Sequence, residues 1–359
     1  MSMKVEDNIF KFYRGKRVLV TGHTGFIGSW LTKWLTLMDT NVCGFSLDPP
    51  SSPNLYELLK VNESVIDIRG DIRDKNLLQS SLNKFKPEIV IHLASQPLVL
   101  DSYSNPLETY DVNVTGTANL LNELRKIETL KTIIVVTSDK SYHNNEWVYP
   151  YREIDPLGGT DPYSASKSCQ DIVVNSFRES FFLDSEVGIS SVRSVNVIGG
   201  GDWAPHRIIP DLVRGIVKGE TVRIRNPLSV RPWQHVLEPI SGILTLVERM
   251  NNDIKFAGAW NFGPENNVEI TVKELVDAFI NCWGSGNYSI DEMQNYKEAS
   301  YLRLDISKAK SELKWKPRYD FRVALQETVD WYREYYKCPS TMGKKTDAQI
   351  EKYCSISNA

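Results

Sequence analysis

The sequence contains no long apolar run, and this absence limits the classes of protein to which it can belong. A membrane-spanning helix needs about 18 consecutive apolar residues, and no stretch of the 359 residues approaches that length. The first 16 residues alternate charged and aromatic side chains and lack the apolar centre of a signal peptide. We therefore expect a protein that has no membrane partner and no secretion signal.

Cysteine is scarce and follows no pairing pattern. The chain has five cysteines, an odd number, and none of them stands in CxxC spacing. This argues against a disulfide framework and against a zinc site, so no bound metal is expected. Reduced thiols are typical of the cytoplasm, which is the predicted location.

An excess of charge of one sign is also missing. The chain carries 42 basic and 45 acidic residues, which are interspersed and leave a net charge of −3. A nucleic-acid or anionic membrane surface would be matched by a cluster of basic residues. Neither is therefore expected as a partner.

What the chain does have is a repeated pattern from residue 10 to residue 198. Short runs rich in Val and Ile alternate with longer segments of helical period, for example residues 28–38, 113–127 and 164–182. Runs that are apolar on both faces predict parallel strands covered by helices. The pattern predicts an α/β fold with a doubly wound parallel (Rossmann) sheet. The predicted strands are residues 17–22, 41–47, 65–71, 88–95, 131–139 and 188–199.

After residue 198 this rhythm ends, and Gly, Pro, Trp and Arg become frequent. We expect residues 199–335 to form mostly a smaller, mixed α/β substrate domain that closes over the strand ends. About residues 235–263 are expected to return to the first domain. Residues 338–359 are polar and show no clear period, so they are predicted to form a loose tail.

A glycine-rich loop follows the first predicted strand. Gly22 permits a tight turn, Gly25 lets the backbone approach a pyrophosphate, and Gly28 lets the next helix pack closely. The helix N-terminus then offers free N–H groups to phosphates. A glycine-rich turn without a ligand is the alternative. The residues predicted to hold a dinucleotide here are Gly22, His23, Thr24, Gly25, Phe26, Ile27 and Gly28.

Two acids at strand ends are the predicted adenosine contacts. Asp48 lies 20 residues beyond Gly28, where a carboxylate binds ribose hydroxyls and would repel a 2′-phosphate. NAD is therefore favoured over NADP. Asp71 ends the third run and is a candidate adenine contact. Either acid can instead be an ordinary residue of a turn.

Three residues form the predicted catalytic group. Tyr163 and Lys167 are four residues apart in a predicted helix, so their side chains share one face. The lysine can lower the pKa of the phenol, and the tyrosine then acts as acid or base on a substrate hydroxyl. Ser138, at the end of the preceding strand, is placed to orient the same hydroxyl.

These motifs resemble those of the extended short-chain dehydrogenases/reductases, over about residues 10–335. Longer strings, among them GGGDWA and RPWQHVLEP, are similar to the CDP-glucose 4,6-dehydratases, a subgroup that supplies 3,6-dideoxysugars for surface polysaccharides. The resemblance implies NAD-dependent conversion of CDP-D-glucose to CDP-4-keto-6-deoxy-D-glucose. In that reaction C4 is oxidised, water is eliminated across C5 and C6, and the hydride returns to C6.

The resemblance also assigns expected roles to further residues. Asp139 is expected to protonate the departing C6 hydroxyl, which requires a raised pKa. Lys140 stands where related dehydratases have Glu and is expected to act as base at C5, or only to hold a ligand. Implied cofactor contacts are Ile72, Leu93, Ala94, Ser95 and Thr137. Implied substrate contacts are Gln96, Asn196, Arg207, Arg231 and Tyr301, with the arginines as forks for the pyrophosphate.

Other functions stay open at this point. One is a different nucleotide-sugar enzyme, either an inverting 4,6-dehydratase on a UDP-sugar or a 4-epimerase. Another is a non-enzymatic NAD-binding protein, since fold does not determine function. The Asp139–Lys140 pair counts against an epimerase, and the Ser–Tyr–Lys group counts against a protein without activity. A homodimer is expected, paired through the helices that contain residues 113–121 and 163–174.

Overall fold

The computed structural model describes residues 7–265, 269–290 and 301–356. Its centre is a seven-stranded parallel sheet in the order β10-β6-β5-β4-β1-β2-β3. The predicted α/β fold with a doubly wound sheet is confirmed. The strands are β1 (Arg17–Thr21), β2 (Asn41–Ser46), β3 (Ile66–Arg69), β4 (Ile89–His92), β5 (Thr132–Val136), β6 (Gly188–Ser194) and β10 (Gly258–Phe262).

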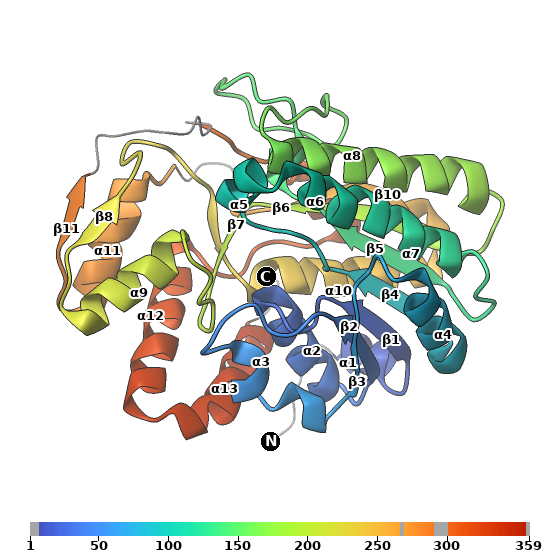
Figure 1. The fold of residues 1–359 in the computed structure, drawn as a ribbon, viewed down its shortest axis with the longest axis horizontal. Helices are drawn as coiled ribbons and strands as arrows, with labels where there is room; N and C mark the ends of the chain where they lie inside the picture. The colour runs from blue at the N-terminus through green and yellow to red at the C-terminus, as the bar shows by residue number, and fades with distance from the viewer. Residues whose placement is uncertain (1–6, 266–268, 291–300, 357–359) are drawn as a thin grey trace.

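Helices cover both faces of this sheet (Figure 1). In β1, Val18 and Val20 face one way and pack with residues of α2 (Phe26–Leu37) and α10 (Leu237–Asn252). Leu19 faces the other way and packs with residues of three helices. This alternation explains why the strands are apolar on both faces. The three helices are α4 (Lys75–Phe85), α7 (Gly116–Leu124) and α8 (Pro162–Phe177).

The order of the strands reverses between β1 and β4. From β1 the chain moves outward through β2 to β3, and it then returns to pair β4 with the other edge of β1. In doubly wound folds, ligands bind in the crevice beyond the carboxyl ends of the strands at such a reversal. The sheet therefore places its candidate site between the segments that follow β1 and β4.

A smaller mixed region lies beside these strand ends, at the left of Figure 1. β8 (Val222–Ile224) pairs with β11 (Tyr288–Ile290), next to α9 (Ile208–Lys218) and α11 (Val272–Trp283). A further pair is β7 (Asn196–Ile198) with β9 (Trp233–His235). The residue boundaries between the two domains stay a prediction. Other helices are α1 (Asp7–Tyr13), α3 (Leu55–Leu58), α5 (Val99–Ser104), α6 (Pro106–Tyr110), α12 (Phe321–Lys337) and α13 (Met342–Ser355).

No helix in the described ranges combines the length and the apolar character that a bilayer span requires.

The C-terminal segment differs from its prediction. Residues 342–355 form α13, in which Met342, Ile350 and Tyr353 are buried. The Tyr353 hydroxyl donates a hydrogen bond of 2.7 Å to Glu238 of α10. The prediction of a loose tail is therefore wrong for these residues, because a few apolar side chains at helical spacing suffice to dock a mostly polar helix. Residues 357–359 lie outside the described ranges.

Docking of α13 predicts a difference between two neighbouring substitutions. Ile350→Ala should lower the free energy of unfolding by about 2–4 kcal/mol, because Ile350 is 1% exposed and its removal leaves a cavity. Glu351→Ala is the matched control, since Glu351 is exposed on the same helix, and it should change stability by less than about 0.5 kcal/mol. Urea unfolding measures both. Equal, small effects would contradict the docking of α13.

Candidate active site

A cavity of about 660 Å³ lies at the carboxyl ends of the central strands. Its walls are the glycine-rich loop after β1, the segments after β4 and β5, and the segment around β8 of the smaller region. Its volume is in the range of small-molecule sites. The reversal of strand order has thus produced a cavity between the sheet and the smaller region.

The glycine-rich loop leaves a space beside the start of α2. Gly22 has φ of +77°, a conformation that L-residues with side chains rarely adopt. A Cβ at Gly28 would lie 2.1 Å from the Gly22 oxygen, so close helix packing requires glycine there. A Cβ at Gly25 would meet only that same oxygen, at 3.4 Å, and would otherwise fill the space beside the helix N-terminus. Gly25 is the N-cap and offers no side-chain acceptor, so the loop fits a pyrophosphate.

Both predicted adenosine contacts line the cavity. The Asp48 side chain is 89% exposed, with the Arg69 Nε atom 3.8 Å from its carboxylate. Asp71 accepts a hydrogen bond of 2.6 Å from Arg73, and this hydrogen bonding lowers the pKa of the Asp71 carboxyl. Both side chains therefore present oxygen atoms to the cavity that can accept hydrogen bonds from hydroxyls or amines.

The predicted Ser–Tyr–Lys group is assembled at the end of β5. Burial raises the pKa of Tyr163 to about 12, and a hydrogen bond with Ser138 opposes that rise. The Lys167 amine donates to Gln170 at 3.0 Å and to the Val136 carbonyl at 3.4 Å. Burial lowers the pKa of Lys167 to about 8, and Asp171 opposes that shift. These shifts move the proton affinities of the phenol and the amine apart, so the lowered pKa that the sequence predicts for Tyr163 is not supported.

A short 3₁₀ turn, η3 (Asp139–Ser141), follows Ser138 and carries the next two candidate groups. Asp139 is 4% exposed and accepts a hydrogen bond of 3.0 Å from Ser138. Burial raises the pKa of Asp139, whereas Lys140, Ser138 and Arg231 oppose the rise. Asp139 can therefore hold a proton at a pH where an exposed aspartate would not.

Arginines line the side of the cavity formed by the smaller region. Arg207 lies 3.0 Å from Asp202, and this neighbour raises the pKa of its guanidinium. Arg231 is 8% exposed and lies in the same wall. A cluster of guanidinium groups suits a diphosphate, whose charge it neutralises with directed hydrogen bonds.

Most of the predicted site residues line this one cavity, but two do not. The His23 ring is fully buried, hydrogen-bonds Asp67 at 2.8 Å, and fills the space beside Gly44. The Tyr301 hydroxyl donates to Glu269 outside the cavity. Side-chain contacts of His23 and Tyr301 with a ligand are therefore not supported. The predicted residues that line the cavity are Gly22, Thr24, Gly25, Phe26, Ile27, Gly28, Asp48, Asp71, Ile72, Leu93, Ala94, Ser95, Gln96, Thr137, Ser138, Asp139, Lys140, Tyr163, Lys167, Asn196, Arg207 and Arg231.

Sequence reasoning missed several other lining residues. Asp202 and His206 lie in the string GGGDWAPHR, beside the predicted Arg207. The other missed residues lie in the string RIRNPLSVRPW, from which the prediction takes only one of three arginines. Which of them faces the cavity depends on how the segment turns around β8, and the string alone does not show this. The missed residues include Asp202, His206, Arg223, Arg225, Asn226, Ser229 and Trp233.

Three features define the class of this protein: a glycine-rich loop at the reversal of a doubly wound sheet, a serine at the end of a strand, and a helix with the YxxxK motif. The protein is an extended short-chain dehydrogenase/reductase. Within that class it belongs to the GDP-mannose 4,6-dehydratase family, whose model matches residues 19–328. The predicted resemblance to nucleotide-sugar 4,6-dehydratases, which are lyases, is thereby confirmed at the level of the family.

Individual relatives agree with this assignment. CDP-glucose 4,6-dehydratase of Salmonella typhimurium is 47% identical over 333 residues, which cover 91% of this chain and 93% of that protein. UDP-glucose 4-epimerase of Mycolicibacterium smegmatis is 27% identical over 323 residues, or 88% of this chain and 98% of that protein. The solved dTDP-glucose 4,6-dehydratase of Bacillus anthracis, in complex with NAD, has a TM-score of 0.76 at 25% identity and covers 90% of this chain and 98% of its own.

Proposed function

We propose that the protein converts CDP-D-glucose to CDP-4-keto-6-deoxy-D-glucose. The observation that carries the proposal is the position of the Asp139–Lys140 turn. It opens into the same cavity as Tyr163 and Lys167, and directly follows Ser138. Oxidation at C4 needs one set of proton-handling groups, and elimination across C5 and C6 needs another. Both sets have to lie within reach of the same sugar. The substrate is inferred from the relative at 47% identity, which is named for CDP-glucose.

NAD is the cofactor that we propose for the glycine-rich loop. The space beside Gly25 and the uncapped start of α2 fit its pyrophosphate, and the exposed Asp48 carboxylate suits ribose hydroxyls rather than a 2′-phosphate. Bound NAD supplies reversible acceptance of a hydride, taken from C4 of the sugar and returned to C6.

Oxidation at C4 requires that the C4 hydroxyl also loses its proton. We assign this proton to the Tyr163 phenolate oxygen, with Ser138 donating a hydrogen bond that holds the substrate oxygen. For the phenol to accept this proton, the positive charge of Lys167 on the same helical face has to offset the rise in the Tyr163 pKa that burial causes. The product of this step is a C4 ketone, which makes the C5 proton acidic.

Elimination then breaks the C5–H and C6–O bonds. The Lys140 amine takes the C5 proton, and the electron pair of that bond forms the C5–C6 double bond. Asp139 gives its proton to the departing C6 hydroxyl, so water leaves and the aspartate becomes a carboxylate. The hydride that returns to C6 and a proton that adds to C5 saturate the C5–C6 double bond. The net change is the loss of one water.

The nucleotide end is proposed to lie against the smaller region. Arg207 and Arg231 line the same cavity and can neutralise the diphosphate of the sugar nucleotide. Asn196 and Gln96 also line the cavity and offer amide groups to the sugar or its phosphate. This arrangement would place the sugar between the diphosphate and the catalytic turn.

We further propose a homodimer and a cytoplasmic location. Exposed apolar side chains, Leu107 and Tyr110 of α6 and Ile172 of α8, are 83%, 36% and 56% exposed and lie on helices that contact each other. These helices lie together on one face of the sheet (Figure 1). Pairing with a second copy would cover these side chains. The cytoplasmic location rests on the absence of a disulfide pattern.

The first prediction concerns the substrate. Incubated without added NAD with a panel of CDP-glucose, dTDP-glucose, UDP-glucose and UDP-N-acetylglucosamine, the purified protein should dehydrate CDP-glucose only. Proton NMR should show a 6-deoxy methyl group and carbon-13 NMR a 4-keto carbon, with no net reduced nicotinamide. A product that is only the C4 epimer, or no product from any sugar, would refute the proposed function.

The second prediction separates oxidation from elimination. Lys140→Met should still allow oxidation at C4, because Ser138, Tyr163 and Lys167 are untouched, but should reduce formation of the dehydrated product by about 100-fold or more. Rapid quenching with product analysis measures both steps. Lys131→Met is the matched control at the opposite end of β5, where Lys131 pairs with Glu186 at the surface, and should behave as wild type. Full dehydration by Lys140→Met would exclude Lys140 as the base.

A further inference from the structure

The η3 turn is anchored at both of its ends. At its N-terminal end, the Ser138 hydroxyl accepts a hydrogen bond of 3.2 Å from the Lys140 backbone. At its C-terminal end, the Ser141 carbonyl accepts hydrogen bonds from the Ser168 hydroxyl at 2.7 Å and from the Gly158 backbone at 2.9 Å. The two candidate groups for elimination therefore lie between two attachment points, Ser138 just beyond β5 and Ser168 on α8.

Tyr142, which directly follows the turn, is held by its hydroxyl. It is 1% exposed, donates to the Asn261 side chain at 2.8 Å, and accepts from the Arg193 guanidinium at 2.8 Å. Its ring stacks on Tyr151 with centroids 5.2 Å apart. The hydroxyl therefore connects the end of the turn to two adjacent strands, because Arg193 of β6 and Asn261 of β10 are register partners.

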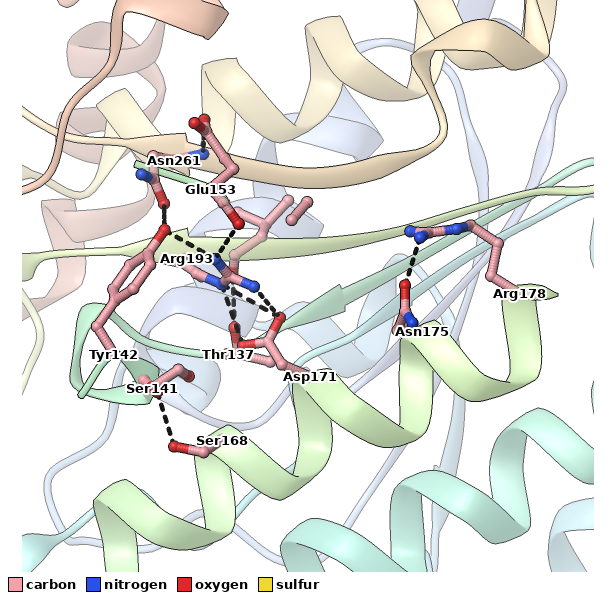
Figure 2. Close-up of polar contacts among 12 residues, drawn as sticks. Thr137, Ser141, Tyr142, Glu153, Ser168, Asp171, Asn175, Arg178, Arg193 and Asn261 are labelled. Atoms are coloured by element: carbon pink, nitrogen blue, oxygen red, sulfur yellow. Dashed lines mark hydrogen bonds and ion pairs between the residues drawn. The ribbon is translucent and has the colours of Figure 1, made fainter. Parts of the chain in front are cut away.

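Arg193 extends this connection to the catalytic helix. Its guanidinium forms a buried ion pair with Asp171 of α8 at 3.1 Å, and it also donates to the Glu153 carbonyl at 3.1 Å. Figure 2 shows Arg193 between Tyr142 and Asp171, with Asn261 on the far side of the tyrosine hydroxyl. The two charged side chains are 4% and 1% exposed, so the pair is shielded from solvent and holds a defined geometry.

Asp171 lies on the helical face that carries the oxidation group. Tyr163, Lys167 and Asp171 are spaced by four residues on α8, so they stand in one row. The chain of contacts from Asp171 through Arg193 to Tyr142 therefore joins the helix that carries the oxidation group to the turn that carries the elimination group. Neither Tyr142 nor Arg193 lines the cavity.

We propose that Tyr142 is a positioning residue for elimination: its hydroxyl, held by Arg193 and Asn261, sets the distance between the Asp139–Lys140 turn and the Tyr163–Lys167 row. This inference rests on the proposed function. It goes beyond that function because it assigns a role to a residue that never touches the substrate.

The effect should fall on elimination rather than on oxidation. Tyr163 and Lys167 keep contacts of their own without Tyr142, since the Ser102 hydroxyl accepts from the Tyr163 backbone at 3.1 Å and Gln170 holds the lysine amine. The C-terminal end of the Asp139–Lys140 turn is held by the Ser141 carbonyl, by the Tyr142 hydroxyl and, one residue further on, by the His143 backbone, which donates to the Pro156 carbonyl at 2.9 Å. Of these contacts, only those of the Tyr142 hydroxyl join the turn to β6 and β10. A shift of the turn by a fraction of an ångström is enough to slow proton transfer.

Tyr142→Phe tests the proposal because it removes the hydroxyl and keeps the ring. We expect kcat for dehydration to fall about 10- to 100-fold with KM unchanged. During turnover the absorbance of reduced nicotinamide should persist, because oxidation at C4 outpaces elimination. The dissociation constant for NAD should match that of the wild type.

Tyr151→Phe is the matched control. It removes a hydroxyl from the same aromatic stack, but that hydroxyl donates to Asn144 and accepts from the Asn145 backbone, away from the turn. Its kcat, KM and absorbance during turnover should equal those of the wild type. A similar loss of kcat in both variants would overturn the proposal, because it would show a general effect of the stack.

Amide hydrogen exchange gives a readout that needs no substrate. In Tyr142→Phe, exchange of the segment over residues 138–142 should accelerate, whereas exchange over residues 163–171 should stay at the wild-type rate. Unchanged exchange at residues 138–142, or a kcat loss without persistent reduced nicotinamide, would overturn the positioning role. If the exchange changes as expected but the wild type does not dehydrate CDP-glucose, the proposed function fails and the anchoring of the turn stands.

Discussion

The parallel pairing of β1, β4 and β5 is the constraint on which the rest of the structure depends. Thr21 of β1 is in register with His92 of β4, and His92 with Val135 of β5, so the three strands end at one edge of the sheet. The glycine-rich loop, the segment of residues 93–100 and the catalytic turn leave the sheet there. The hydrogen bonds of the sheet thus bring the glycine-rich loop and the catalytic turn together, and the packing of α8 adds the Tyr163–Lys167 row.

Burial then gives the side chains at this edge their chemistry. It raises the pKa of Asp139 and of Tyr163 and lowers that of Lys167, each time by disfavouring the charged form. An exposed aspartate would be ionised and unable to act as an acid. The same desolvation would be costly without partners. Ser138 supplies one for Asp139 through a hydrogen bond, and Gln170 and the charge of Asp171 supply them for Lys167. Structure and reactivity therefore depend on the same buried network.

The sequence allowed prediction of features whose cause is local. The central strands were visible as Val- and Ile-rich runs, the loop as three glycines, and the catalytic helix as YxxxK. Features that depend on distant contacts were not predicted. α13 docks on a glutamate 115 residues away, and the side chains of Arg193 and Tyr142 are 51 residues apart in sequence. His23 stands inside the loop motif, yet only the packing of β2 and β3 shows that its ring is turned toward Asp67.

The central claim is that one cavity oxidises C4 and reduces C6 of the same sugar. The most direct measurement uses CDP-glucose deuterated at C4, with the position of the label in the product read by NMR or mass spectrometry. The account predicts one deuterium in the C6 methyl group and none at C4 of the 4-keto-6-deoxy product, even when unlabelled NAD is present in excess. A label retained at C4, or a C6 methyl group without deuterium, would contradict it.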